Sequence, residues 1–241
     1  MEHDALVDAV EREAALIVTA LREGPLDAAV PSCPGWTMAD LANHVGNFTV
    51  WAHVLCEGTG RPKPPFPDRP EGDAVVDWAE ELAGLLVREL RATPRDTEVW
   101  TWVRSDKTAG FVARRAANEL AIHRVDAQLA RGAPQPIDAT HAAEIIDEIF
   151  VLRNDAEQPD PHVGSGETLH LHGTDREGDE WMITLAPDRL AVTREHAKGD
   201  LALRGTVSDL ALLLYGRPTL GDVDRFGDGS VLDVWSREFR F

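Results

Sequence analysis

Apolar residues recur every three or four positions in four segments of the first part of the chain, a spacing typical of amphipathic helices. The second of these segments opens with Thr37 and Asp40, a capping-box pattern that marks the start of a helix. Gly24 and Gly132 follow the first and fourth segments and are typical helix stops. The predicted helices cover about 6–21, 37–55, 73–91 and 107–131. Together they predict an all-α four-helix bundle whose long second connection contains the proline-rich segment 60–73.

The pattern changes after Pro136. A fifth helix is expected over 137–152, and a polar linker with proline and glycine follows it. Short, partly alternating runs then predict strands, and a helix and a last helix or turn are expected near the C-terminus. The strands are expected at 167–174, 179–186, 189–195 and 201–205, the helix at 206–217, and the last helix or turn at 230–239. We therefore expect two domains, the all-α bundle at 1–155 and a smaller α+β domain at 156–241.

Composition and charge narrow the function. The chain has 241 residues, 43% of them hydrophobic, which is enough to bury a core. Its formal net charge of -18 disfavours nucleic acid and anionic membranes as partners. No apolar run reaches the roughly 20 residues that a membrane span needs, and the acidic N-terminus does not resemble a signal peptide, so a cytoplasmic protein is expected. Cys33 and Cys56 are expected to be free thiols.

The fourth predicted helix carries a candidate metal site. Glu119 and His123 are four residues apart and share one face of this helix. His44 falls on the buried side of the second helix and is the best candidate for a third ligand. Two imidazoles and one carboxylate are a donor set of catalytic zinc. The alternatives are a hydrogen-bonded core histidine and a simple contact between neighbouring helical turns. Glu119 discriminates between them, because a buried carboxylate must be paired, protonated or metal-bound.

Three stretches of the chain resemble the mycothiol-dependent maleylpyruvate isomerase family. They are VPSCPGWTMADLANHVGNFTVWA at 30–52, RRAANELAIHRVDAQLA at 114–130 and DLALRGTVSDLALLLYGRP at 200–218. The resemblance implies a DinB-like metal-binding bundle followed by a small sterol-carrier-like domain. It also implies zinc bound by His44, Glu119 and His123, with mycothiol as the thiol cofactor. Arg217 is the best match for an arginine of the small domain that holds an anionic substrate.

Two residues depart from the family pattern. Asn118 stands where many relatives have a histidine, and Val125 stands where an aromatic residue is common. These departures predict a changed environment beside the metal. Among other candidates, Cys33 is expected to be structural, Trp36 to anchor the core, and Arg124 and Asp126 to lie beside the site or at the surface.

The resemblance and the candidate metal site together predict an enzyme. Coordination to zinc would convert a thiol to a thiolate at neutral pH. Addition of a thiolate to a conjugated double bond, followed by rotation and elimination, isomerises the bond, whereas addition alone transfers the thiol. The sequence therefore predicts an isomerase or S-transferase that acts with a low-molecular-weight thiol on a small electrophilic, anionic substrate. A zinc hydrolase and a non-catalytic binding protein are the alternatives, and the oligomeric state is left open.

Overall fold

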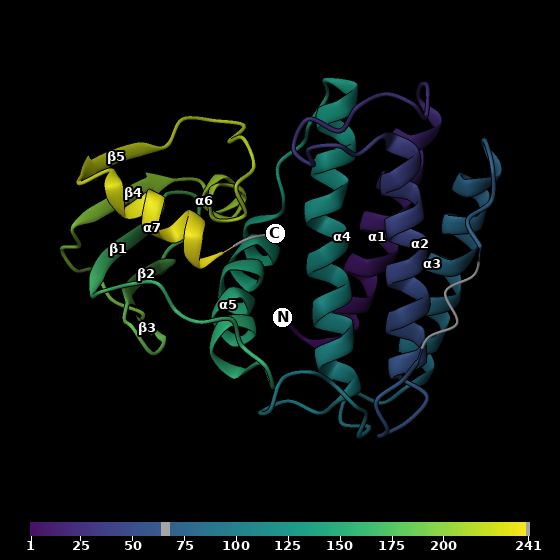
Figure 1. The fold of residues 1–241 in the computed structure, drawn as a ribbon, viewed down its shortest axis with the longest axis horizontal. Helices are drawn as coiled ribbons and strands as arrows, with labels where there is room; N and C mark the ends of the chain where they lie inside the picture. Colours follow the sequence, from purple (N-terminus) through teal and green to yellow (C-terminus); the bar gives the residue numbers. More distant parts are fainter. Residues whose placement is uncertain (64–67, 240–241) are drawn as a thin grey trace. The chain divides into compact units, whose positions relative to one another are not determined.

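The chain forms two compact units in a computed structural model that describes residues 1–63 and 68–239. The first unit, Met1–Gln135, contains four long helices, which are α1 His3–Arg22, α2 Met38–Leu55, α3 Ala74–Ala92 and α4 Ala109–Arg131 (Figure 1). Both α1 and α2 pack against α3 and α4. This arrangement confirms the predicted bundle. The connection from α2 to α3 is long, as expected, although residues 64–67 of its proline-rich segment lie outside the described residues.

The helix boundaries follow from residues that the sequence analysis identified. The Thr37 hydroxyl accepts a hydrogen bond from the Asp40 backbone N–H, at 3.2 Å, and the Asp40 carboxylate accepts one from the Thr37 backbone N–H, at 2.9 Å. This reciprocal pair satisfies two N–H groups that the first turn of α2 would otherwise leave unbonded. At the end of α4, Gly132 has a φ of 72°, a left-handed conformation that favours glycine.

The second unit, Pro136–Phe241, combines helices with a mixed sheet. Helix α5 Ala139–Asp155 precedes the sheet, whose strand order is β3-β2-β1-β4-β5. Strands β1 and β4 are parallel, and the other neighbouring strands are antiparallel. The strands are β1 Glu167–Gly173, β2 Glu180–Leu185, β3 Leu190–Thr193, β4 Leu201–Gly205 and β5 Asp224–Gly227, and the remaining helices are α6 Val207–Leu214 and α7 Ser230–Glu238. All of these elements except β5 were predicted.

Helix α5 belongs to the second unit, so the division falls after Gln135 and not at the expected boundary between residues 155 and 156. Two sets of contacts attach α5 to the sheet. The Asn154 side chain exchanges two hydrogen bonds with the backbone of Leu190, and the Trp181 indole N–H donates to Asp147 at 2.8 Å. The linker after α5 marks a break in secondary structure and not a break in packing.

The central strands of the sheet present two different faces. Leu169 and Leu171 alternate along β1 with His170 and His172, and Trp181 of β2 lies opposite Leu171. Strand geometry sends alternate side chains to opposite faces, so the leucines and Trp181 share one face. Leu169, Leu171 and Trp181 are fully buried. The histidines project from the opposite face.

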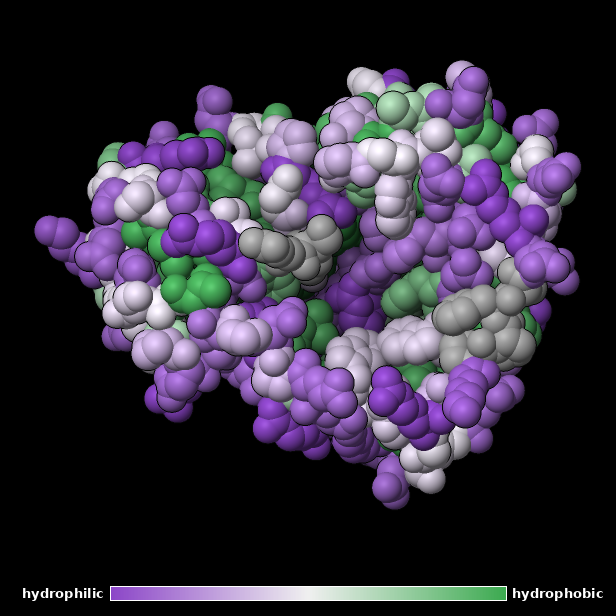
Figure 2. Space-filling model, in the orientation of Figure 1, coloured by the Kyte–Doolittle hydropathy of each residue, from purple (hydrophilic) through white to green (hydrophobic). Residues whose placement is uncertain are grey.

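The surface of each unit is predominantly hydrophilic in the view of Figure 2, as expected for a chain with a net charge of -18. Within the described ranges, only Leu16, Val163 and Phe226 are large apolar residues classed as exposed. No described helix combines the length and apolar character needed to cross a bilayer.

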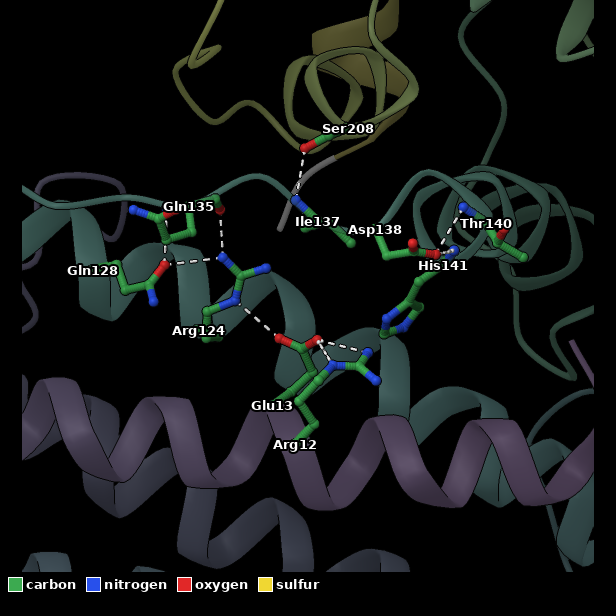
Figure 3. A network of polar contacts seen from close by, with 10 residues as sticks. All are labelled: Arg12, Glu13, Arg124, Gln128, Gln135, Ile137, Asp138, Thr140, His141 and Ser208. Carbon is green, nitrogen blue, oxygen red and sulfur yellow. Dashed lines mark hydrogen bonds and ion pairs between the residues drawn. The ribbon is translucent and has the colours of Figure 1, made fainter. Parts of the chain in front are cut away.

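A buried ion pair joins α1 to α4 in the bundle. The Arg124 guanidinium donates to the Glu13 carboxylate at 2.9 Å, and both residues are only 2% exposed (Figure 3). The same guanidinium donates to the Gln128 side chain at 2.9 Å and to the backbone oxygen of Gln135. Arg124 is therefore buried and not a surface residue, and these contacts connect it to α1 and to the end of α4. It fixes the end of the bundle where the chain leaves α4.

Removing Arg124 should destabilise the bundle strongly. We expect Arg124→Met to lower the free energy of unfolding by about 3–5 kcal/mol, because it removes the buried cation that pairs with a buried carboxylate. Urea denaturation with a metal chelator present measures this change without a contribution from metal binding.

Arg12 provides the matched control, because it donates to the same Glu13 carboxylate at 3.0 Å but has a side chain that is 48% exposed. Arg12→Met should cost less than about 1 kcal/mol. The double variant Glu13→Gln/Arg124→Met should recover part of the stability lost in Arg124→Met. Equal effects of the two arginine substitutions would contradict this account of the ion pair.

Candidate metal and thiol site

Helices α2 and α4 bring the three predicted ligand residues together. His44 comes from α2, and Glu119 and His123 come from successive turns of α4. His44 Nε2 is 2.9 Å from Glu119 Oε1, and His123 Nε2 is 3.3 Å from the same oxygen. One donor atom from each residue lies within 4.8 Å of the other two. The sequence therefore predicted the juxtaposition correctly, and the role of these residues as metal ligands stays a prediction.

Arg115 compensates the charge of Glu119 from one turn earlier on α4. Its guanidinium forms an ion pair with Glu119 Oε2, while Oε1 faces the two imidazoles. Arg115 is 8% exposed, so the ion pair is largely shielded from water. The bundle thus places a cationic group beside the candidate ligands, which the sequence analysis did not identify. The four-residue spacing from Arg115 to Glu119 was the available signal.

Asp126 orients His123. Its carboxylate is completely buried, and Oδ2 accepts a hydrogen bond from His123 Nδ1 at 2.9 Å. With the proton on Nδ1, the lone pair of His123 is on Nε2, the nitrogen that faces Glu119. Asp126 therefore holds the His123 ring with Nε2 towards Glu119, a contact that its position three residues later on α4 could have indicated.

Cys33 also reaches this network. Its thiol donates to Asp126 Oδ2 at 3.4 Å, although 93 positions separate the two residues in the chain. Donor atoms of Cys33, His123 and Asp126 lie within 4.8 Å of one another and form a second possible metal-binding group. In that group His123 would bind the metal through Nδ1. That nitrogen already carries the proton of the hydrogen bond to Asp126. The sequence placed Cys33 in a structural turn but gave no sign of its contact with α4.

The turn before α2 positions an aromatic ring against both imidazoles. Gly35 has a φ of 85°, and the Trp36 backbone N–H donates to the Cys33 carbonyl at 3.0 Å. The Trp36 ring centroid is 5.0 Å from that of His44 and 6.0 Å from that of His123. Trp36 packs against the core, as expected, and in addition restricts the orientation of both histidine rings. The glycine permits the left-handed backbone that this turn requires.

Burial keeps His44 unprotonated at neutral pH. Partial removal from water lowers its pKa to about 3, and the positive charge of Arg115 acts in the same direction. A neutral imidazole can offer a lone pair to a metal ion, whereas an imidazolium cannot. The site therefore presents one carboxylate oxygen and two imidazole nitrogens, which is the donor set of several catalytic zinc sites.

Arg217 lies in the second unit, directly after α6. Its backbone N–H donates to the Leu212 carbonyl at 2.8 Å, while that of Gly216 donates to Leu213 at 3.0 Å. Gly216 has a φ of 68°, and together these features form a helix-ending Schellman motif. The Arg217 guanidinium donates to the Tyr215 carbonyl at 2.8 Å. The motif fixes the backbone at Arg217, and binding of a substrate by its side chain stays a prediction.

Comparison with known proteins supports the fold and identifies the family. The family model described as mycothiol maleylpyruvate isomerase N-terminal domain matches residues 7–128, just over half of the chain, and this range includes all three predicted ligands. No curated protein matches the chain.

Two solved structures share the fold over both units. A crystal structure of the mycothiol-dependent maleylpyruvate isomerase is 18% identical, with a TM-score of 0.66 and 93% of each chain covered. A crystal structure of a histidine-to-alanine mutant of the mycothiol-dependent maleylpyruvate isomerase is 17% identical, with a TM-score of 0.63 and 88% of each chain covered. At such low identity these likenesses support the fold, whereas the match over residues 7–128 establishes the family. The chain belongs to the mycothiol maleylpyruvate isomerase family.

Proposed function

We propose that the protein is a metal-dependent, mycothiol-using enzyme that isomerises a small anionic electrophile or transfers the thiol to it. The observation that carries this proposal is the convergence of His44 Nε2, His123 Nε2 and Glu119 Oε1. Membership of the family supports mycothiol as the thiol. The bundle supplies the metal and thiol chemistry in this proposal, and the second unit supplies Arg217 for the substrate.

The donor geometry fits a divalent metal, most naturally zinc. Asp126 holds His123 with Nε2 directed to Glu119, and Arg115 holds the other oxygen of Glu119, so one oxygen is left facing the imidazoles. Such supporting hydrogen bonds orient metal ligands in known sites. A bound zinc ion would lower the pKa of a thiol placed on it, so that the thiol is a thiolate at neutral pH. The protein residues thus fix donors and exclude water from one side.

Trp36 and the buried network limit where a thiol and a substrate can approach. Trp36 stands against the two imidazole rings, and Asp126 is completely buried behind His123. His44, with a side chain that is 33% exposed, lies at the accessible side of the donor set. We infer that thiol and substrate enter from the side of His44.

The first prediction from this proposed function concerns metal content. Purified protein should bind one divalent metal ion per chain at this site, so His44→Ala, Glu119→Ala and His123→Ala should each hold one ion per chain fewer, because each change removes one donor from the set. Elemental analysis after dialysis against trace zinc measures the loss. His53→Ala is the matched control on α2, since donor atoms of His53 belong to none of the candidate metal groups in the described chain.

Two neighbours of His123 refine this test. Asp126→Asn should keep the three donors but weaken zinc affinity by about 10- to 100-fold, because the partner of His123 Nδ1 is altered. Cys33→Ser should leave zinc affinity unchanged. Loss of the metal in Cys33→Ser but not in Glu119→Ala would move the site to Cys33, His123 and Asp126.

The second prediction concerns the thiol. Cobalt-substituted protein should develop a sulfur-to-metal charge-transfer absorption when mycothiol is added, because cobalt reports sulfur ligation in a site built for zinc. Glu119→Ala should abolish this absorption. A cobalt spectrum that responds to simple anions but not to mycothiol would favour a hydrolase, and protein without any metal would favour a binding function.

The third prediction concerns Arg217. Its planar guanidinium can form two parallel hydrogen bonds with a carboxylate, whereas lysine offers a point charge. Arg217→Lys should therefore raise KM for an anionic substrate by roughly tenfold, about 1.4 kcal/mol, without loss of metal or thiol binding. The backbone bonds that end α6 do not depend on this side chain.

Arg225→Lys is the matched control, because Arg225 is an exposed arginine of the same unit. Unchanged steady-state kinetics in both Arg217→Lys and Arg217→Ala, with a confirmed anionic substrate, would exclude Arg217 as the substrate anchor.

A further inference from the structure

Three histidines surround one carboxylate in the second unit, outside the candidate site of the bundle. His170 and His172 project from the same face of β1, and Glu180 of β2 lies opposite His172. His196 comes from the segment that follows β3. Within β1 alone, the two histidines only share one face of a strand. The sheet adds a carboxylate and a third imidazole.

The Glu180 carboxylate is shared among all three imidazoles. Oε2 is 2.6 Å from His170 Nε2, while Oε1 is 2.5 Å from His172 Nδ1 and 3.0 Å from His196 Nδ1. One donor atom each from His170, Glu180 and His196 lies within 4.8 Å of the other two. Tetrahedral zinc with bonds of about 2.0–2.1 Å separates its ligand atoms by roughly 3.3 Å. Small side-chain rotations would therefore open room for an ion.

The surroundings of the cluster favour a cation. Imidazole nitrogens of three histidines lie within 3.0 Å of the Glu180 carboxylate oxygens, so nitrogen and oxygen donors converge at one point. Arg204 of β4 pairs with His172 in register, and its guanidinium is directed to Asp224 at 3.4 Å. The chain as a whole carries a net charge of -18.

The cluster is also accessible and adjustable. The side chain of His170 is 4% exposed and anchors the cluster in the sheet, whereas that of His196 is 76% exposed. An ion can reach Glu180 from the side of His196, and His196 can move to complete the coordination. The cluster thus combines two ligands fixed in strands with one exposed ligand. It shares only its donor types with the bundle site, since different elements supply them.

We propose that His170, Glu180 and His196 form a second transition-metal site, with zinc as the natural candidate and His172 as the residue that positions Glu180. The donor set again has two imidazoles and a carboxylate, which zinc accepts. His172 Nδ1 holds Glu180 Oε1 in place, as an outer hydrogen-bond partner of a metal ligand does. This site is independent of mycothiol chemistry in the bundle.

Metal stoichiometry in the untagged full-length protein tests the proposal. After equilibrium dialysis against micromolar zinc, His196→Ala should hold one zinc ion per chain fewer than the unmodified protein. Because His196 is exposed, this substitution leaves the fold intact, and circular dichroism should show it. Glu195→Gln is the matched control, since it removes an exposed carboxylate from the same segment without touching the cluster.

Combination with the bundle variant separates this proposal from the proposed function. His123→Ala protein should retain a zinc ion, and this ion should disappear when His196→Ala is added. Cobalt bound to His123→Ala protein should give visible d–d absorption, and mycothiol should not add a sulfur charge-transfer absorption to it. Equal zinc content in His196→Ala, Glu195→Gln and unmodified protein would overturn the second site and show a metal-free hydrogen-bonded cluster, whatever the bundle binds.

Discussion

The charge of Glu119 is the constraint on which the bundle site depends. A carboxylate on a largely buried helical face is costly unless cations or donors surround it. Arg115 occupies one oxygen, and the other faces the imidazoles of His44 and His123. One carboxylate oxygen and two imidazole nitrogens thus lie together, as the proposed metal site requires. A divalent ion would supply the remaining positive charge.

The same constraint explains why α4 carries so many buried polar groups. Asp126 is paired with His123, and Arg124 with Glu13, while the intervening positions are mostly alanine, leucine and valine. Buried pairs of this kind contribute little net stability compared with apolar packing, but breaking one is expensive. Their contribution is to side-chain orientation, because each buried charge keeps its partner only when the two side chains stay in place. Helix α4 thereby fixes the orientation of Glu119 and His123 to the rest of the bundle.

The sequence was informative wherever a local rule determines the structure. Helical periodicity located all four bundle helices, and the Thr37–Asp40 spacing predicted an observed capping box. Strand β5 was missed because all four of its residues are exposed and give no apolar alternation. The grouping of α5 with the second unit depends on tertiary contacts such as Trp181 with Asp147, which no local pattern encodes.

The candidate site, too, could be predicted from the sequence only in part. Spacing within α4, supported by the family resemblance, identified Glu119 and His123, and the apolar stripe of α2 identified His44. Distant partners were not accessible from one sequence. Cys33 contacts Asp126, Trp36 contacts both imidazoles, and His196 contacts Glu180. In each case a turn or loop brings a residue against a helix or strand elsewhere in the chain. Such contacts can be recognised only in the folded structure.

The most direct test of the central claim is X-ray absorption at the zinc edge, with His196→Ala protein used so that only the bundle ion contributes. We expect a first shell of nitrogen and oxygen with the multiple-scattering signal of two imidazoles. On addition of mycothiol, one sulfur should enter at about 2.3 Å. A first shell that lacks imidazole, or that stays free of sulfur at saturating mycothiol, would contradict the proposal that His44, Glu119 and His123 hold a metal that binds the thiol.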